Sequence, residues 1–188
     1  MNMVIKMEKT LEIEFKNALT ESEYEALSNK YNFPEGHWHE NYYFDTVDHK
    51  LASKKQVLRI RKKSNGYELT LKTPNPKGGN DEYSEIISEG NFSLIYQTGV
   101  TPQVFGIKDK VKFITSVKTL RKELTLNGGL FSLDFTVFKD QTTDYELEME
   151  YSDVKKGQKI FLEFLEENSI KTKQIDGKTK RAFKKLSK

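Results

Sequence analysis

The sequence predicts an α+β protein that is mainly antiparallel β, built on one sheet that is closed or strongly curved. Most segments alternate apolar and polar residues with period 2, which is the pattern of half-buried strands. Turn signals such as Asn65-Gly66 and Asn127-Gly128 separate these segments, and only a few stretches show helical spacing. Many hairpin-connected strands with a few helices favour a single curved sheet.

Eight segments have the alternation and the flanking turn residues of strands. Asn65-Gly66 predicts a hairpin between two of them, residues 74–80 read as a loop, and Asn127-Gly128-Gly129 predicts a second tight turn. The predicted strands span residues 12–16, 41–45, 57–63, 67–72, 82–87, 111–126, 130–138 and 145–151.

Helical spacing is confined to a few places. Residues 20–23 (Thr-Glu-Ser-Glu) have the capping-box pattern of a helix start. Residues 91–99 and 102–108 have the character of short helical turns, and residues 155–168 form the clearest predicted helix, with apolar residues on one face. The basic tail 178–188 is predicted to be a docked terminal helix with a solvated lysine face.

Composition predicts one domain over residues 1–188 and excludes several classes. Hydrophobic residues make up 36% and charged residues 31%, enough apolar content for a core and too much for disorder. The net charge of +3 gives no reason to expect nucleic acid as a partner. No cysteine is present, which excludes disulfides and thiolate metal sites. Without a signal peptide or membrane span, the chain is expected to be cytoplasmic, with no membrane partner.

The polar faces of the strands carry bulky charges of both signs. Side chains at i, i+2 and i+4 of a strand share one face, so Glu12, Glu14 and Lys16 point the same way. The wet side of a sheet is the ordinary explanation for one such strand. Here the pattern recurs, with carboxylates on the first and last strands and basic residues between. The later residues are Arg59, Arg61, Glu68, Lys72, Arg121, Glu123, Asp134, Glu146, Glu148 and Glu150.

If these faces point inward, they form a charged tunnel whose desolvation requires a charged ligand. Clustered glutamates without histidine or cysteine favour hard cations with oxygen ligands, Mg²⁺ or Mn²⁺. Clustered arginines and lysines favour phosphate oxygens, which arginine binds bidentately. Together, the clustered glutamates and the clustered basic residues predict a polyphosphate ligand that carries a bound metal ion.

At this point the sequence resembles the CYTH domain family, also called triphosphate tunnel metalloenzymes. The signature Glu-x-Glu-x-Lys matches residues 12–16, the Tyr-Phe-Asp-Thr strand matches residues 43–46, and the Arg-x-Arg strand matches Arg59 and Arg61. A Leu-Thr-Leu-Lys strand, an arginine strand, an aspartate strand and a Glu-x-Glu strand follow in the family's order. They are matched by residues 69–72, Arg121, Asp134, and Glu146 with Glu148.

The resemblance implies an eight-stranded closed β-barrel, a triphosphate tunnel, with flanking helices. It implies metal binding by Glu12, Glu14, Asp134, Glu146 and Glu148. It implies substrate binding by Lys16, Arg59, Arg61, Lys72, Arg121, Lys178 and Arg181, the last two from a C-terminal segment that departs from the family pattern. Of two glutamates in the family's glutamate-rich strand, Glu85 fits better than Glu82.

Two functions follow from the resemblance, and a third, of a different class, stays open. The leading hypothesis is a Mg²⁺- or Mn²⁺-dependent triphosphatase acting on inorganic triphosphate or a nucleoside or organic triphosphate, with catalytic roles for Glu14, Glu148 and Lys72. The second is a class IV-type adenylyl cyclase that converts ATP to cyclic AMP. The third is a polyphosphate- or nucleotide-binding module without turnover. The expected partner is a small-molecule triphosphate, bound by a monomer or homodimer.

Two other motifs have simple structural readings. His37-Trp38-His39 is read as an exposed loop rather than a metal site. Lys77-Gly78-Gly79-Asn80 lacks the strand and helix context of a phosphate-binding loop and is read as a mobile loop.

Overall fold

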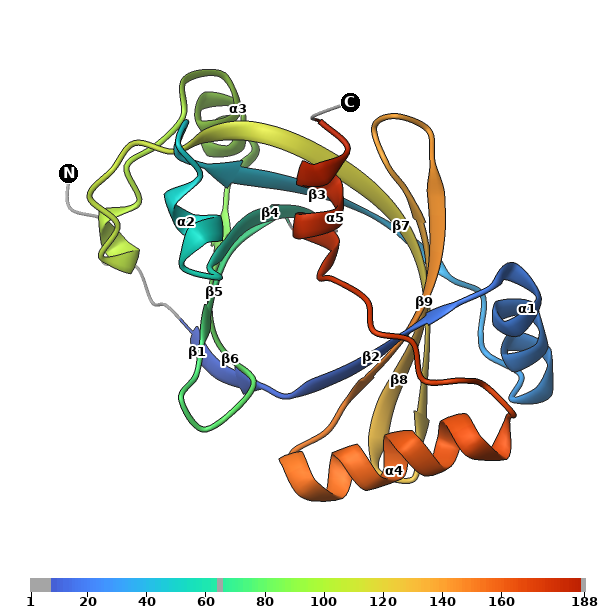
Figure 1. Ribbon diagram of the computed structural model, residues 1–188. Helices are drawn as coiled ribbons and strands as arrows, with labels where there is room; N and C mark the ends of the chain where they lie inside the picture. Colours follow the sequence, from blue (N-terminus) through green and yellow to red (C-terminus); the bar gives the residue numbers. More distant parts are fainter. Residues whose placement is uncertain (1–7, 64–65, 187–188) are drawn as a thin grey trace. The chain divides into compact units, whose positions relative to one another are not determined.

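The computed structural model of the chain describes residues 8–63 and 66–186. They form a mainly antiparallel β fold with flanking helices, which confirms the predicted fold class (Figure 1). The strands are β1 (Glu8–Glu12), β2 (Glu14–Leu19), β3 (His37–Asp45), β4 (Val57–Lys63), β5 (Gly66–Pro74), β6 (Asn80–Ile87), β7 (Lys112–Leu126), β8 (Gly129–Val137) and β9 (Thr143–Glu150). The helices are α1 (Glu21–Lys30), α2 (Lys50–Ser53), α3 (Glu89–Thr98), the 3-10 turn η1 (Gln103–Phe105), α4 (Val154–Glu167) and α5 (Lys178–Lys184).

The chain divides into two compact units, each built from segments far apart in the sequence. Of the described residues, the first unit comprises 8–11, 40–63, 66–116 and 179–186. The second comprises Glu12–His39 and Val117–Lys178. The single domain predicted for residues 1–188 stays a prediction.

In the first unit the strand order is β1-β6-β5-β4-β3. One face of this sheet packs with Phe92 and Ile95 of α3 in an apolar cluster. The buried residues that β4 and β5 contribute to this cluster are Leu58, Ile60, Leu69 and Leu71. The intervening residues point to the opposite face because side chains alternate along a strand; they are Arg59, Arg61, Thr70 and Lys72.

The end of β3 is held by the carboxylate of Asp45, which is 1% exposed. Asp45 Oδ1 accepts hydrogen bonds from the backbone N–H of Thr46 at 2.7 Å and of Leu51 at 2.9 Å. Its Oδ2 accepts one from the N–H of Ala52 at 3.0 Å. These bonds satisfy N–H groups in the first turn of α2. The sequence patterns did not predict this short helix, because its N-cap residue His49 makes no side-chain cap and the capping carboxylate comes from an aspartate six residues before Leu51.

In the second unit two helices cover a sheet of strand order β7-β8-β9-β2. α1 and α4 are labelled beside this sheet in Figure 1. Leu27 of α1 and Phe161 and Phe164 of α4 belong to the apolar cluster on its covered face. The buried strand residues in this cluster are Phe131, Leu133, Leu147 and Met149. The alternate residues of β8 and β9 lie on the opposite face and are buried as well; they include Ser132, Asp134, Glu146 and Glu148.

Both helices of the second unit begin at capping residues. The hydroxyl of Thr20 accepts from the N–H of Glu23 at 3.2 Å, and the Glu23 carboxylate accepts from the N–H of Thr20 at 2.7 Å, so the predicted capping box is confirmed. At α4, Asp153 Oδ1 accepts from the N–H of Lys156 at 2.8 Å. The predicted helix 155–168 is confirmed, with both its start and its end one residue earlier.

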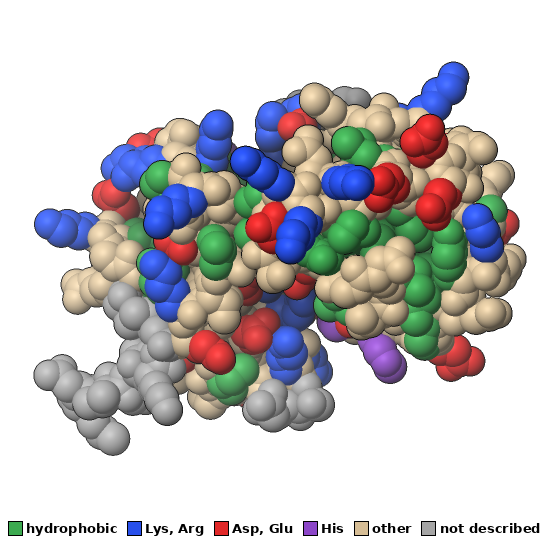
Figure 2. Space-filling model, turned by 90° about the horizontal axis from the view of Figure 1, so that it is seen from below, with side chains coloured by type: hydrophobic (Ala, Val, Ile, Leu, Met, Phe, Trp, Pro, Cys, Tyr) green, Lys and Arg blue, Asp and Glu red, His purple; other side chains and the backbone are tan. Residues whose placement is uncertain are grey.

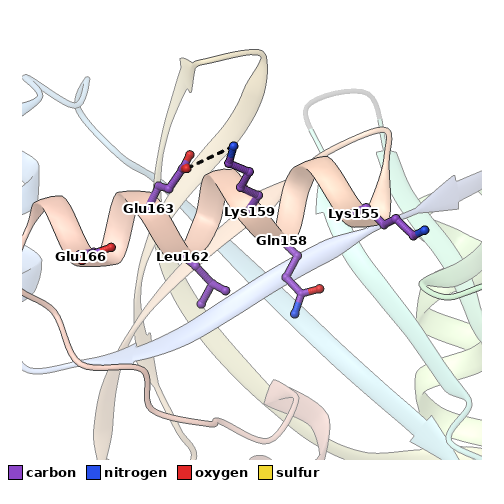
Figure 3. Close-up of a pocket in the computed structure, with 6 residues that line it drawn as sticks. All are labelled: Lys155, Gln158, Lys159, Leu162, Glu163 and Glu166. Atoms are coloured by element: carbon purple, nitrogen blue, oxygen red, sulfur yellow. Dashed lines mark ion pairs between the residues drawn. The ribbon is translucent and has the colours of Figure 1, made fainter.

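The outward face of α4 is mostly polar and lines a shallow pocket (Figure 3). On it Lys159 Nζ lies 3.7 Å from Glu163 Oε1, an exposed ion pair four residues apart that contributes little stability. The lining residues are Lys155, Gln158, Lys159, Leu162, Glu163 and Glu166.

The predicted first strand is interrupted at Ile13, which belongs to neither β1 nor β2. Its carbonyl accepts a hydrogen bond of 3.0 Å from the N–H of Tyr151. The prediction of one continuous strand face over residues 12–16 is therefore wrong, because Glu12 ends β1 and Glu14 begins β2. The break makes nine strands among the described residues instead of eight, and β1 and β2 stand at the two ends of the strand order. In the strand order of the described residues, β1 and β2 are not hydrogen-bonded neighbours, so the predicted closure of the barrel is not found there.

The predicted turns have mixed outcomes. Asn127 and Gly128 have positive φ of 50° and 77° and join β7 to β8 as predicted. The other turn prediction falls on Asn65, which lies outside the described residues. His37-Trp38-His39 is part of strand β3, so its assignment to a loop is wrong.

Basic and acidic side chains are interspersed on the face of the molecule shown in Figure 2. A mixed surface is what a net charge of +3 from 31 basic and 28 acidic residues predicts. Of the helices formed by the described residues, none has the length and apolar character needed to span a membrane.

Candidate functional site

Asp134, Glu146 and Glu148 form a buried acidic group in the second unit. Asp134 faces Glu146 across β8 and β9, and Glu148 follows two residues later on the same face of β9. One carboxylate oxygen of each residue lies within 4.8 Å of the corresponding oxygens of the other two. Asp134 and Glu146 are fully buried, and Glu148 is 7% exposed. Buried carboxylates require cations or metal ligation, so this acidic group is a candidate site.

The ammonium of Lys178 contacts every member of the acidic group. Its Nζ lies 2.7 Å from Asp134 Oδ2, 2.7 Å from Glu146 Oε2 and 2.7 Å from Glu148 Oε1. Lys178 is the first residue of α5, far from the carboxylates in sequence. The structure thus brings the predicted C-terminal lysine onto the predicted metal ligands.

Two further cations adjoin the acidic group. Arg121 donates to both carboxylate oxygens of Asp134, at 2.8 and 2.6 Å, and to Glu148. Lys16 Nζ lies 3.7 Å from Glu148 Oε1 and 3.9 Å from Glu146 Oε1. Lys16 Nζ is also 2.7 Å from Glu14 Oε1, so Glu14 is linked to the acidic group through a shared lysine.

These contacts determine the ionisation of the group. Burial on its own would raise the pKa of Glu148, but Lys178, Arg121 and Lys16 hold that pKa well below its ordinary value. Burial likewise opposes charge on Lys178, yet the carboxylates of Asp134, Glu148 and Glu146 raise its pKa well above the ordinary value. The Glu148 carboxylate and the Lys178 ammonium are therefore both charged at neutral pH.

The donor set of the acidic group fits a hard divalent cation, since several carboxylate oxygens converge within reach of one ion. Of the five predicted metal ligands, the structure brings together Asp134, Glu146 and Glu148. Glu14 reaches the group through Lys16, and Glu12, at the end of β1, is not part of the converging set among the described residues.

A second charged group, the basic group, lies in the first unit and consists of Arg59, Arg61 and Lys72. Arg61 Nε donates to the buried Asn41 Oδ1 at 2.8 Å. A carboxylate oxygen of Glu82 lies 3.7 Å from an Arg59 nitrogen, and its other oxygen lies 3.2 Å from Lys72 Nζ. The side chains of Arg59 and Lys72 are 12% and 19% exposed. Such largely buried cations suit phosphate oxygens.

Strand register assigns Glu82, and not Glu85, to the face of the basic group. Glu82 pairs with Lys72 across β5 and β6, whereas Glu85 pairs with Leu69 of the apolar face. The preference for Glu85 drawn from the sequence is therefore wrong. Burial raises the pKa of Glu85, as expected for a carboxyl beside apolar neighbours.

The C-terminal segment forms α5, which confirms the predicted terminal helix over Lys178–Lys184. Ala182 is 3% exposed, and the Phe183 ring lies 5.2 Å from the ring of His49, so α5 is docked in the first unit. Arg181 is half-buried in this helix, and Lys178, at its start, belongs to the second unit.

Residues 10–183 match the family model described as "CYTH domain". This chain belongs to the CYTH domain family. The CYTH chain is 31% identical over 190 residues to a Bacillus subtilis (strain 168) protein named "Putative triphosphatase YjbK", with 97% of this chain and 99% of that protein covered.

Solved CYTH-like structures share the fold. A Bacillus halodurans structure named a "putative adenylate cyclase" superposes with a TM-score of 0.85 at 26% identity, covering 93% of this chain and 98% of that one. The Hippeastrum protein HpAC1, a "putative adenylyl cyclase" whose structure was presented with a dominant triphosphatase activity, has a TM-score of 0.73 at 21% identity. The match to HpAC1 covers 94% of this chain and 96% of HpAC1. At 21% identity it supports a shared fold and nothing more.

Three polar residues with structural contacts were not predicted as site residues from the sequence. Asn41 and Glu82 contact the basic group, and both lie on strands whose register no pattern could fix. Asn17 is fully buried on β2. A signal for Asn17 was present, because it is the polar residue in the apolar series Ile13, Phe15, Asn17, Leu19.

Proposed function

We propose that this CYTH protein hydrolyses a triphosphate in a reaction that depends on a divalent metal ion. The observation that carries the proposal is the acidic group, three buried carboxylates with oxygens within 4.8 Å of one another. A protein that only binds phosphate gains nothing from burying carboxylates, since they repel anions and are costly to desolvate. The name of the Bacillus subtilis relative supports the same reaction class.

The proposal assigns metal binding to the second unit. Asp134, Glu146 and Glu148 would hold Mg²⁺ or Mn²⁺, with Glu14 and Glu12 as the remaining predicted ligands. When bound, such an ion neutralises charge on phosphoryl oxygens and polarises the phosphorus centre. Because the pKa of Glu148 is held well below its ordinary value, Glu148 serves as an ionised ligand.

Phosphate binding is assigned first to the basic group. Arg59 and Arg61 have planar guanidinium groups that engage phosphate oxygens bidentately, and Lys72 adds a point charge. In the CYTH structure Glu82 contacts two of the three cations, so substrate phosphate would replace its carboxylate as their partner. The other cations assigned to phosphate by the resemblance are Lys16, Arg121, Lys178 and Arg181.

The catalytic assignment follows from charge development. Triphosphate hydrolysis is an in-line displacement by water in which charge grows on the phosphoryl and leaving oxygens. We assign Lys72 the role of a cation that stabilises the negative charge growing on those oxygens. Glu14, whose side chain is 20% exposed, is the most open of the carboxylates around Lys16 and is assigned as proton acceptor for the attacking water.

Adenylyl cyclase activity is the second candidate, and one observation favours it: the similar Bacillus halodurans structure is named a "putative adenylate cyclase". The same metal and phosphate contacts would serve attack by the ribose hydroxyl on the α-phosphate of ATP. The small-molecule substrate, a monomer or homodimer, and a cytoplasmic location stay predictions.

Product identity tests the proposal. Purified protein is incubated with inorganic triphosphate or with ATP, each with Mg²⁺, with Mn²⁺ and with excess chelator, and both phosphate and cyclic AMP are measured. Metal-dependent phosphate release supports the proposal, and cyclic AMP from ATP supports the second candidate. Tight binding of triphosphate with neither product would show a binding module and overturn the proposed reaction.

A further inference from the structure

The segment between α4 and α5 is fastened to the edge strand β2 by the side chain of Asn17. Asn17 is 0% exposed. Its Nδ2 donates to the carbonyl of Lys171 at 3.2 Å, and its Oδ1 accepts from the N–H of Lys173 at 2.6 Å. The N–H of Ala18 adds a hydrogen bond of 3.3 Å to the carbonyl of Lys173. One buried carboxamide thus grips the segment on both sides of residue 172.

This segment leads directly to Lys178. After Lys173 the chain runs to Lys178, the first residue of α5, along the red segment that joins α4 to α5 in Figure 1. At Gly177, in this segment, an added Cβ would meet nothing within 4 Å. The Lys178 ammonium then lies 2.7 Å from an oxygen of each member of the acidic group. Four residues, 174–177, separate this grip from Lys178, so the grip at residues 171–173 fixes the chain close to the start of α5.

We propose that Asn17 is a positioning residue that holds the Lys178 ammonium on the acidic group, where the ammonium competes with a divalent metal ion for the same oxygens. The inference rests on the proposed function, because it takes Asp134, Glu146 and Glu148 as metal ligands. It extends that function, because a metal ion that binds to these carboxylates must displace the Lys178 ammonium from them. A released ammonium is then available to the phosphates of the substrate.

Geometry and charge support the competition. Oxygens that coordinate Mg²⁺ lie about 2.0–2.1 Å from the ion. An ammonium 2.7 Å from the same three oxygens occupies the space in which such an ion would sit. Two cations that close also repel each other strongly in a buried site. Arg121 approaches Asp134 and Glu148 from β7 and shares Asp134 Oδ2 with Lys178. It can stay, because it also engages Asp134 Oδ1 and Glu148 Oε2, two oxygens that Lys178 does not contact.

The test measures Mn²⁺ binding by calorimetry in the absence of any triphosphate. Lys178→Met removes the competing charge and keeps the aliphatic stem, so the association constant for Mn²⁺ rises about tenfold, the value of one charged hydrogen-bonding partner. Asn17→Ala loosens the segment and raises the constant in the same direction by a smaller factor. The double variant binds no more tightly than Lys178→Met alone, since Asn17 acts only through Lys178.

A second pair of variants probes the same grip from the segment side and serves if Asn17→Ala fails to fold. Lys173→Pro removes the backbone N–H that donates a hydrogen bond to Asn17 Oδ1. It is expected to strengthen Mn²⁺ binding as Asn17→Ala does. Lys173→Ala is the matched control: it loses the 3.1 Å ion pair with Glu23 but keeps the backbone N–H, so Mn²⁺ binding stays at the wild-type value.

The outcomes separate this inference from the proposed function. If wild type binds Mn²⁺ and Lys178→Met binds it equally or more weakly, the competition is refuted and the metal site stands. Unchanged binding in both Asn17→Ala and Lys173→Pro, or additive effects in the double variant, refutes the positioning role. If neither wild type nor Lys178→Met binds Mn²⁺, the proposed metal-dependent function fails as well.

Discussion

Arg121 and Asp134 face each other across strands β7 and β8, and the guanidinium donates to both oxygens of the carboxylate, at 2.8 and 2.6 Å. Asp134 is fully buried. Burial would raise its pKa, but Lys178 and Arg121 hold that pKa below the ordinary value. A directly opposed pair on neighbouring strands therefore keeps a buried carboxylate ionised, which a metal ligand requires.

Arg121→Ala is expected to destabilise the protein by about 3–5 kcal/mol, because it leaves the Asp134 and Glu148 carboxylates buried with one cation fewer. Urea unfolding measures the change. Lys159→Ala, which breaks an exposed ion pair on α4, is the control and should stay within about 0.5 kcal/mol of wild type. Equal effects of the two substitutions would contradict the account of Arg121.

Gly157→Ala is expected to destabilise the protein by about 1–3 kcal/mol, although alanine favours helices. An added Cβ on this α4 residue would lie 2.5 Å from Phe15 Cε2 and 2.9 Å from Tyr151 Cβ. Gly90→Ala is the matched control in α3, where the nearest atom is Ser88 Oγ at 3.9 Å, and it should stabilise by about 0.5–1 kcal/mol. Thermal unfolding of both variants gives the signs, and a stabilised Gly157→Ala protein would show that α4 packs less closely on β2.

Glu82 should make stability depend on pH. Burial would raise its pKa, but Lys72 and Arg59 lower it in the folded protein. A lowered folded-state pKa adds stability above the unfolded value of about 4.3, and that stability is lost as the pH falls through the folded-state pKa. Glu82→Gln should therefore be less stable than wild type by about 1 kcal/mol at pH 7. Urea unfolding at pH 7 and pH 3 should show this gap shrinking, and a gap independent of pH would rule out the ion-pair explanation.

The fold class and much of the candidate site follow from the alternation of residues along strands. Arg59, Arg61 and Lys72 gather on one face, as do Asp134, Glu146 and Glu148, because period-2 alternation and hairpin pairing are local properties that a sequence displays. The helices with capping residues next to an apolar stripe, α1 and α4, were predictable for the same reason.

The features that escaped prediction depend on distant parts of the chain. Ile13 leaves the strand where its carbonyl accepts from Tyr151, a bond that no local pattern reports. Asn17 and Lys171 are 154 residues apart in sequence, and Lys178 and Glu146 are 32 residues apart, so no local pattern reports either contact. Choosing between Glu82 and Glu85 required the pairing register of β5 and β6. A slip of one residue in that register would move every side chain of the strand to the other face.

The central claim, that the acidic group supports metal-dependent hydrolysis, is tested most directly by phosphate release from inorganic triphosphate with Mn²⁺, comparing wild type with Glu148→Gln. Glu163→Gln on the exposed face of α4 is the same chemical change at a neutral position and serves as control. The account predicts that wild type and Glu163→Gln release phosphate and stop when a chelator is added, while Glu148→Gln falls at least about a hundredfold with its fold retained. Wild-type rates in Glu148→Gln, or release that continues in chelator, would contradict it.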